Sequence, residues 1–212
     1  IKRRYFLSRS KVDWTENYPD LPLWQSDLTV PKQRLEKGIV FFYHGELAWW
    51  HGLEKFAPIL DELKKHTQVK LVIAGNLYPT SWHFFKIPFT FIEIKKRREL
   101  KEFLKRPDIE HMPRVGLERL KELMHQADFH VSQLSDESKM ADTELRTCLL
   151  EAMAFGLPCL HIPSSAVKRP EFVDEQNLIF IDPARPKESA EKIWAIYRDQ
   201  QKCRQIKTGA QQ

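Results

Sequence analysis

The chain has 212 residues, of which 42% are hydrophobic and 30% charged, so it is long enough to bury the core of an ordinary domain. No apolar run approaches the ~18 residues of a membrane span. The first ten residues carry three arginines and a lysine without an apolar run, so we expect no secretory signal there. A net charge of +5 favours anionic partners, such as nucleotide diphosphates, nucleic acid or an acidic membrane face, without choosing among them.

Three cysteines have neither the spacing of metal ligands nor that of a disulfide framework: Cys148, Cys159 and Cys203. The first two lie among apolar residues and are expected to be small buried side chains. We therefore expect a reducing, cytoplasmic compartment. The chain starts at Ile1 rather than at a methionine, which indicates that further sequence precedes it.

Residues 1–37 contain several prolines and no stable hydrophobic period. We expect an irregular N-terminal arm or interdomain linker there, with one short helix near Trp24. The pattern then changes, and residues 38–212 are predicted to form one Rossmann-like domain. Its first element is the apolar run at 39–43, which is typical of a strand covered on both faces.

Strands and helices are expected to alternate over the rest of the chain. Further strands are predicted at 69–74, 89–94, 112–115, 129–134, 159–162 and 178–181. Helices are predicted at 50–63 with a kink at Pro58, at 117–124, at about 143–155, near Glu171, and at about 186–206. This alternation implies right-handed parallel crossovers, so the predicted fold class is α/β, a doubly wound Rossmann-like parallel sheet.

The predicted helix from about Thr143 carries the most informative residue. In doubly wound sheets ligands bind beyond the carboxyl ends of the strands, where this helix would begin. Its first turn offers free backbone N–H groups and a positive dipole end, which suit a phosphate. Glu151 lies two turns in, among apolar residues, although an isolated carboxylate is costly to desolvate. It could accept hydrogen bonds from the hydroxyls of a ribose, pair with a lysine, or cap a loop.

The order of motifs resembles a known family. Glu-Ala-Met-Ala-x-Gly-x-Pro at 151–158 follows Gln-Ala-Asp-Phe-His-Val-Ser at 126–132. This pair resembles the C-terminal domain of GT-B glycosyltransferases, in particular the retaining family four, also called group one. The strand at 69–75 and the turn at 170–178 are similar to that family too. The resemblance covers about 38–200 and implies the C-terminal half of a GT-B fold, with Glu151 on the ribose of a nucleoside diphosphate sugar.

The resemblance also implies the other site residues. The first turn of the helix would bind the diphosphate, and the adjacent loop would face the transferred sugar. The implied diphosphate contacts are Leu145, Arg146, Thr147 and Lys139. The implied catalytic candidates are Thr143 and Glu144, with Asp142 beside them. Strand ends would add His44, Gly45 and Asn76 to the donor site, although the absence of a functional role for His44 and a plain turn for Asn76 are the alternatives.

The chain differs from the family at positions where the family carries charged side chains. The family has an earlier Glu where this chain has Thr143, and a basic pair where this chain has Glu46 and His51. A carboxylate at a phosphate-binding position would repel a diphosphate. Basic residues of other loops could compensate, namely Arg146, Lys139, Lys168 or Arg169. A hexosyltransferase, a non-catalytic binding or scaffold protein with a degenerate donor site, and another GT-B enzyme such as a sugar-nucleotide epimerase therefore all stay open.

The resemblance implies no metal and no cofactor besides the donor sugar nucleotide, and no His, Asp or Cys cluster has metal-ligand spacing. The acceptor would be a glycan or a lipid-linked molecule of surface polysaccharide assembly, and a further N-terminal domain would bind it. A basic cluster at 95–106 could contact anionic lipid at the inner face of the membrane. Interleaved glutamates favour an ordinary solvated helix instead, and no stacked aromatic pattern supports nucleic-acid binding.

Overall fold

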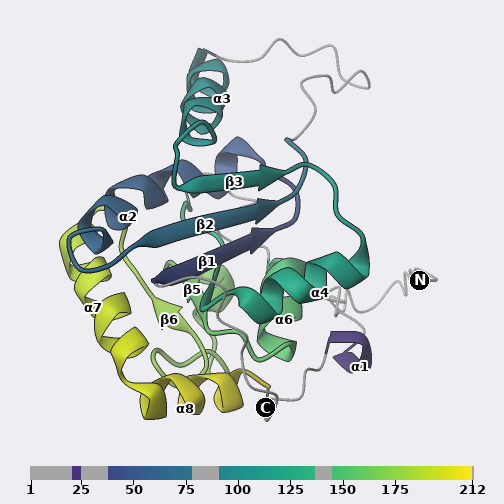
Figure 1. Cartoon of the computed structure of the whole chain (residues 1–212), viewed down its shortest axis with the longest axis vertical. Coiled ribbons are helices and arrows are strands. Elements are labelled where there is room, and N and C mark those ends of the chain that lie inside the picture. Colours follow the sequence, from purple (N-terminus) through teal and green to yellow (C-terminus); the bar gives the residue numbers. More distant parts are fainter. Residues whose placement is uncertain (1–20, 25–37, 78–90, 137–144, 212) are drawn as a thin grey trace, which may run out of the picture.

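A computed structural model describes residues 21–24, 38–77, 91–136 and 145–211. Its centre is a parallel sheet with the strand order β3-β2-β1-β4-β5-β6, which confirms the predicted doubly wound α/β fold (Figure 1). The strands are β1 (Ile39–His44), β2 (Val69–Ala74), β3 (Ile109–Met112), β4 (Phe129–Val131), β5 (Cys159–His161) and β6 (Ile179–Phe180).

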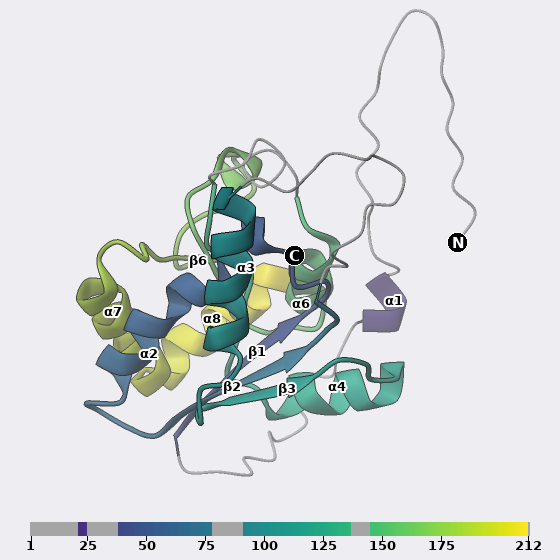
Figure 2. The same ribbon diagram turned by 90° about the horizontal axis from the view of Figure 1, so that it is seen from above.

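Helices cover both faces of this sheet, with α2 and α7 on one face and α4 and α6 on the other (Figure 2). The helices are α1 (Leu21–Trp24), α2 (Ala57–Leu63), α3 (Phe91–Phe103), α4 (Leu117–Gln126), α6 (Thr147–Ala154), α7 (Pro186–Arg198) and α8 (Gln200–Gln211). Short 3-10 turns are η1 (Trp49–His51), η2 (Leu53–Phe56) and η3 (Ser165–Val167). Because side chains alternate along a strand, Phe41 packs in the core under α2 and Phe42 in the core under α6.

The strand order reverses at β1. This strand pairs with β2 on one side and with β4 on the other, and Phe42 is in register with both Val72 and His130. In open α/β sheets ligands bind at such a switch point, beyond the carboxyl ends of the two central strands. The loops that leave β1 and β2 touch there, because a Cβ on Gly75 would lie 1.8 Å from the carbonyl oxygen of Gly45. Only glycine fits at position 75.

Several predicted elements differ from the structure. The predicted strand at 89–94 is wrong over its described part, since Phe91 begins helix α3; a short apolar run alone does not distinguish a strand from a buried helix. The predicted strand at 112–115 lies three residues earlier, in register with β2. The helix expected near Glu171 is absent from the described residues, where turns occur. The last helix is broken at Asp199, whose extended backbone separates α7 from α8.

Helix α1 confirms the short helix expected near Trp24, whose side chain packs in the core under α6. The rest of 1–37 lies outside the described residues, and the predicted division into an arm and a domain stays a prediction. Cys148 and Cys159 are buried, as expected. Among the described residues no helix combines the length and the apolar character that crossing a membrane requires.

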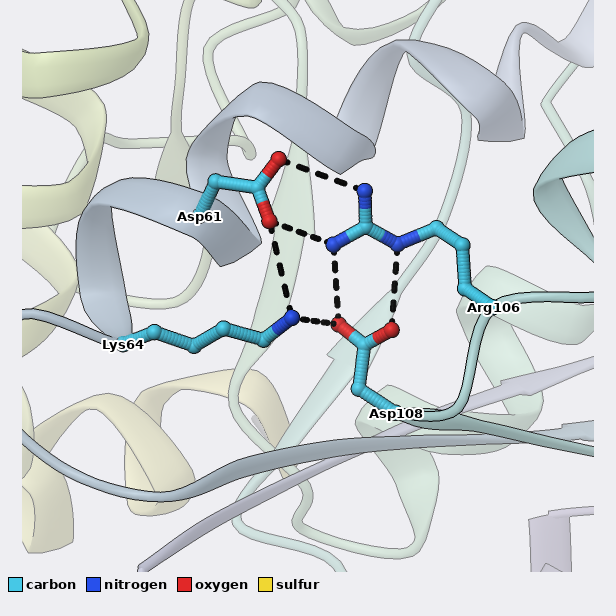
Figure 3. Close-up of polar contacts among 4 residues, drawn as sticks. All are labelled: Asp61, Lys64, Arg106 and Asp108. Atoms are coloured by element: carbon cyan, nitrogen blue, oxygen red, sulfur yellow. Dashed lines mark hydrogen bonds and ion pairs between the residues drawn. The ribbon is translucent and has the colours of Figure 1, made fainter.

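A four-residue ion network joins the end of α2 to the turn between α3 and β3 (Figure 3). Arg106 donates to both carboxylate oxygens of Asp108 at 3.0 Å and also binds Asp61. Lys64 Nζ lies 2.7 Å from Asp108 Oδ2. The side chain of Asp108 is 6% exposed and that of Asp61 54%. Burial alone would raise the pKa of Asp108, but hydrogen bonds from Arg106 and Lys64 outweigh burial and lower it.

We predict that Asp108→Asn lowers the free energy of unfolding at pH 7 by about 2 kcal/mol, because Arg106 and Lys64 lose the charge of a carboxylate that is only 6% exposed. The matched control Asp61→Asn removes an exposed partner of the same arginine and should cost less than about 1 kcal/mol. Urea denaturation measures both. The pKa of Asp108 is depressed by folding, so its contribution is present above about pH 4 and lost as the pH falls through the folded-state pKa. Equal losses in the two variants would contradict this account.

Candidate functional site

The last two residues of β1 contact two side chains of α6, one at its N-cap and one in its second turn. His44 Nε2 lies 2.9 Å from Glu151 Oε2, and the hydroxyl of Tyr43 accepts a hydrogen bond from Arg146 Nη1 at 3.0 Å. Three residues predicted from the sequence therefore come together at the switch point, namely His44, Arg146 and Glu151. Tyr43 was not among the predicted site residues.

Glu151 lies at the edge of an otherwise buried stretch of α6. Its side chain is 20% exposed, whereas Leu149 and Ala152 are fully buried. The polar partner is an imidazole from β1, whose side chain is 5% exposed, rather than the lysine or loop considered from the sequence. The carboxylate is therefore partly desolvated, with one hydrogen bond from the residues that the structure describes and part of the side chain still accessible to solvent.

Arg146 is the N-cap of α6 and has extended backbone geometry, with no side-chain cap hydrogen bond. Its guanidinium stacks over the ring of Tyr43, 5.4 Å from the centroid, and Nη2 lies 3.5 Å from the carbonyl oxygen of Glu46. Gly45 has a φ of 112°, and a Cβ there would lie 3.4 Å from Nη2. The guanidinium therefore lies close to the loop after β1 and places a positive charge over the loop where the resemblance expects an arginine.

The other residues of this loop are neutral or acidic. Burial and the nearby Arg146 lower the pKa of His51 to about 3, so this imidazole is uncharged at pH 7. Burial raises the pKa of Tyr43 to about 12, although Arg146 opposes the shift, so its phenol keeps its proton and donates to Glu46 O at 2.6 Å. The side chain of Glu46 is exposed, and partial burial raises its pKa. Arg146 therefore supplies the positive charge at this loop.

The remaining predicted contacts fall into two groups. Thr147 is exposed at the first position of α6, while Leu145 is half-buried against the core under that helix. Asn76 is exposed, and its backbone oxygen accepts from Leu47 N at 2.8 Å, which joins the loops after β1 and β2. The other group lies outside the described residues and consists of Lys139, Asp142, Thr143 and Glu144. All site assignments stay predictions.

A buried polar row beneath α6 was missed from the sequence. Extending the pairing of Phe42 with His130, and of Val131 with Leu160, places His44, Ser132 and His161 side by side at the ends of β1, β4 and β5. His130 is fully buried, its ring centroid lies 5.0 Å from that of His44, and neither of its nitrogens meets a polar partner among the described residues. The signal was present, because polar residues interrupt runs predicted as buried strands.

His130 and His161 are neutral at pH 7. Burial, followed by the charges of His44 and Arg146, lowers the pKa of His130 well below its ordinary value. Burial lowers the pKa of His161 to about 4, against the opposing hydrogen bond to Ile162 O. Within the described ranges, no group of three or more His, Cys, Asp or Glu residues is arranged to hold a metal ion.

The model of the family described as glycosyl transferases group 1 matches residues 26–212. The chain belongs to this family. A search of curated proteins finds no matching sequence.

Solved structures agree on the fold. Anabaena HepE in complex with UDP and glucose is 18% identical, with a TM-score of 0.64 over 92% of this chain and 50% of that one. Sucrose-phosphate synthase from Thermosynechococcus elongatus is 16% identical, with a TM-score of 0.64 over 92% and 45%. The C-terminal domain of LpcC from Francisella tularensis, a group 1 protein, is 17% identical, with a TM-score of 0.57 over 82% of both chains. The chain thus spans about half the length of the first two and has the fold of a GT-B C-terminal domain.

We predict that His130 makes the group 1 domain less stable in mild acid. Its pKa is lowered by folding, so below about pH 6.5 the unfolded chain binds a proton that the folded chain does not, at a cost of up to about 1.4 kcal/mol per pH unit. Urea denaturation at pH 7.5 and 5.5 should show a loss about 1 kcal/mol smaller in His130→Leu than in the unaltered chain. The control His66→Gln changes an exposed histidine and should leave the loss unchanged. An unaltered pH dependence in His130→Leu would contradict the prediction.

Proposed function

We propose that this chain is the donor-binding half of a retaining glycosyltransferase, which transfers a hexose from a nucleoside diphosphate sugar to a glycan or lipid-linked acceptor. The observation that carries the proposal is the placement of Glu151 and Arg146 on the first two turns of one helix, at the switch point of the sheet. Glu151 follows Arg146 by five positions, and five helical steps correspond to a rise of about 7.5 Å. This is the scale that separates the sugar and the phosphates of a nucleotide.

Each end of that helical stretch suits one part of the donor. The open side of the Glu151 carboxylate would accept hydrogen bonds from the vicinal hydroxyls of the ribose. The backbone N–H groups of the first turn, from Leu145 to Thr147, would bind the diphosphate, with the guanidinium of Arg146 beside them. The helix dipole and the guanidinium would then stabilise the negative charge that develops on the leaving diphosphate, without a metal ion.

Arg146 would supply the positive charge that the loop after β1 lacks. Glu46 and His51 replace the family's basic pair, and neither can attract a phosphate. The guanidinium of Arg146 reaches the same loop from the opposite side, where it binds Tyr43 and lies 3.5 Å from the carbonyl of Glu46. We therefore infer that α6, rather than the loop after β1, supplies the cation for the donor.

The finer assignments are proposals of the same kind. Thr143 or Glu144 would face the transferred sugar, and Lys139 would assist at the diphosphate. HepE, which was solved with UDP, with UDP-glucose, and with UDP and glucose, supports a sugar nucleotide as the donor. The acceptor would bind a part of the enzyme that lies beyond the length of this chain, since HepE is about twice as long.

Peripheral membrane contact through 95–106 is a secondary proposal. Helix α3 extends away from the sheet, and Lys95 and Lys105 are 78% and 69% exposed (Figure 1). Glutamates of the same segment lie close to both lysines, namely Glu99 and Glu102, as expected of an ordinary solvated helix. Sedimentation with anionic vesicles distinguishes the two interpretations.

Calorimetric titration with UDP, GDP and ADP tests the proposed function. We predict that at least one of the three binds, and that Glu151→Ala weakens its affinity tenfold or more, because hydrogen bonds to a charged group are lost. The control Glu188→Ala removes a carboxylate that is 67% exposed on α7 and should leave the affinity unchanged.

Two outcomes would count against this function. Silence from all three nucleotides would favour a non-catalytic binding or scaffold protein that keeps the fold. Binding with unchanged affinity in Glu151→Ala would refute the ribose assignment and move the site elsewhere on the domain.

A further inference from the structure

The ring of His44 contacts aromatic rings from three segments. It stacks on Trp24 of α1, with centroids 6.1 Å apart, and on Phe42 of β1, at 5.7 Å, and it meets His130 of β4 edge-on at 5.0 Å. The side chain is 5% exposed. A ring held in this way presents its two nitrogens in fixed directions, one of them toward α6.

The proton on this ring follows from its partner. An ionised carboxylate only accepts hydrogen bonds, so Nε2, which lies 2.9 Å from Glu151 Oε2, carries the proton. Nδ1, the other ring nitrogen, is buried and meets no polar partner among the described residues. Besides aromatic packing, the described contacts therefore give this buried ring one hydrogen bond, which joins it to Glu151.

That hydrogen bond leaves half of the carboxylate for another partner. It occupies Oε2, and the partly exposed side chain of Glu151 turns its remaining surface toward solvent. A glutamate loses much rotamer freedom when it is fixed. Fixing it before a ligand arrives removes that cost from binding, which is the general advantage of preorganisation.

We propose that His44 is a positioning residue, which holds the carboxylate of Glu151 in the orientation that accepts hydrogen bonds from ribose hydroxyls. It acts through Glu151 and touches no part of the nucleotide itself. The proposal rests on the proposed function, because it needs a nucleotide in the site. It replaces the direct ligand contact predicted for His44 from the sequence.

The test compares a nucleotide with its 2′,3′-dideoxy form, which lacks the hydroxyls that Glu151 would bind. The probe is whichever of UDP, GDP and ADP binds the unaltered chain most tightly. The unaltered chain should prefer the ribose form about tenfold or more. His44→Phe keeps a stacked ring and removes the N–H donor, so this preference should fall to about twofold or less, while the affinity for the dideoxy form stays within about twofold.

Two further variants separate positioning from a general structural role. His44→Gln retains an N–H donor at similar reach and should keep most of the preference for ribose. Glu151→Gln should lose it, as His44→Phe does. Unfolding midpoints are measured for every variant, and His44→Leu makes the same comparison if His44→Phe does not fold.

The outcomes distinguish a failure of the positioning role of His44 from a failure of the proposed function. If His44→Phe keeps the preference for ribose while Glu151→Gln loses it, His44 does not position Glu151 and the proposed function stands. If His44→Phe weakens both nucleotide forms equally, or strengthens binding of the ribose form, the positioning role is overturned as well. If the unaltered chain binds none of the three nucleotides, the proposed function fails, and the positioning role fails with it.

Discussion

The hydrogen bond between His44 and Glu151 is the contact on which the candidate site depends. An unpartnered carboxylate in an apolar helix would be expensive to desolvate. The imidazole at the end of β1 offsets part of that cost at 2.9 Å, across 107 residues of sequence. The strand order brings the two together, since β1 lies beside β4 at the centre of the sheet and α6 follows β4 in the chain. This hydrogen bond therefore makes a carboxylate tolerable at position 151, where the proposed donor would bind.

A second contact between β1 and α6 comes from Tyr43, the residue that precedes His44 on the strand. Tyr43 and His44 point to opposite sides of the strand, and one binds Arg146 while the other binds Glu151. The start of α6 is thus fixed to β1 at two points. A single strand end determines where the positive charge and the carboxylate lie relative to each other, which explains how a chain without the family's basic pair can still present a cation at this loop.

The sequence predicts the parts of this structure that depend on local pattern. Continuous apolar runs identified β1 and β2, and Glu151 stood out because its neighbours along α6 are apolar. The start of α3 was mistaken for a strand, because periodicity does not separate short apolar runs. The partners of Glu151 and Arg146 could not be predicted, since both contacts join segments more than 100 residues apart. Only the register of the sheet decides which side chains of β1 face α6.

A structure of the chain bound to the nucleoside diphosphate that it binds most tightly tests the central claim most directly. The account predicts ribose hydroxyls within hydrogen-bond distance of Glu151, and phosphate oxygens against the first turn of α6 and the guanidinium of Arg146. His44 should keep its hydrogen bond to Glu151 in that complex. A nucleotide bound elsewhere, or one bound here with its ribose turned away from Glu151, would contradict it.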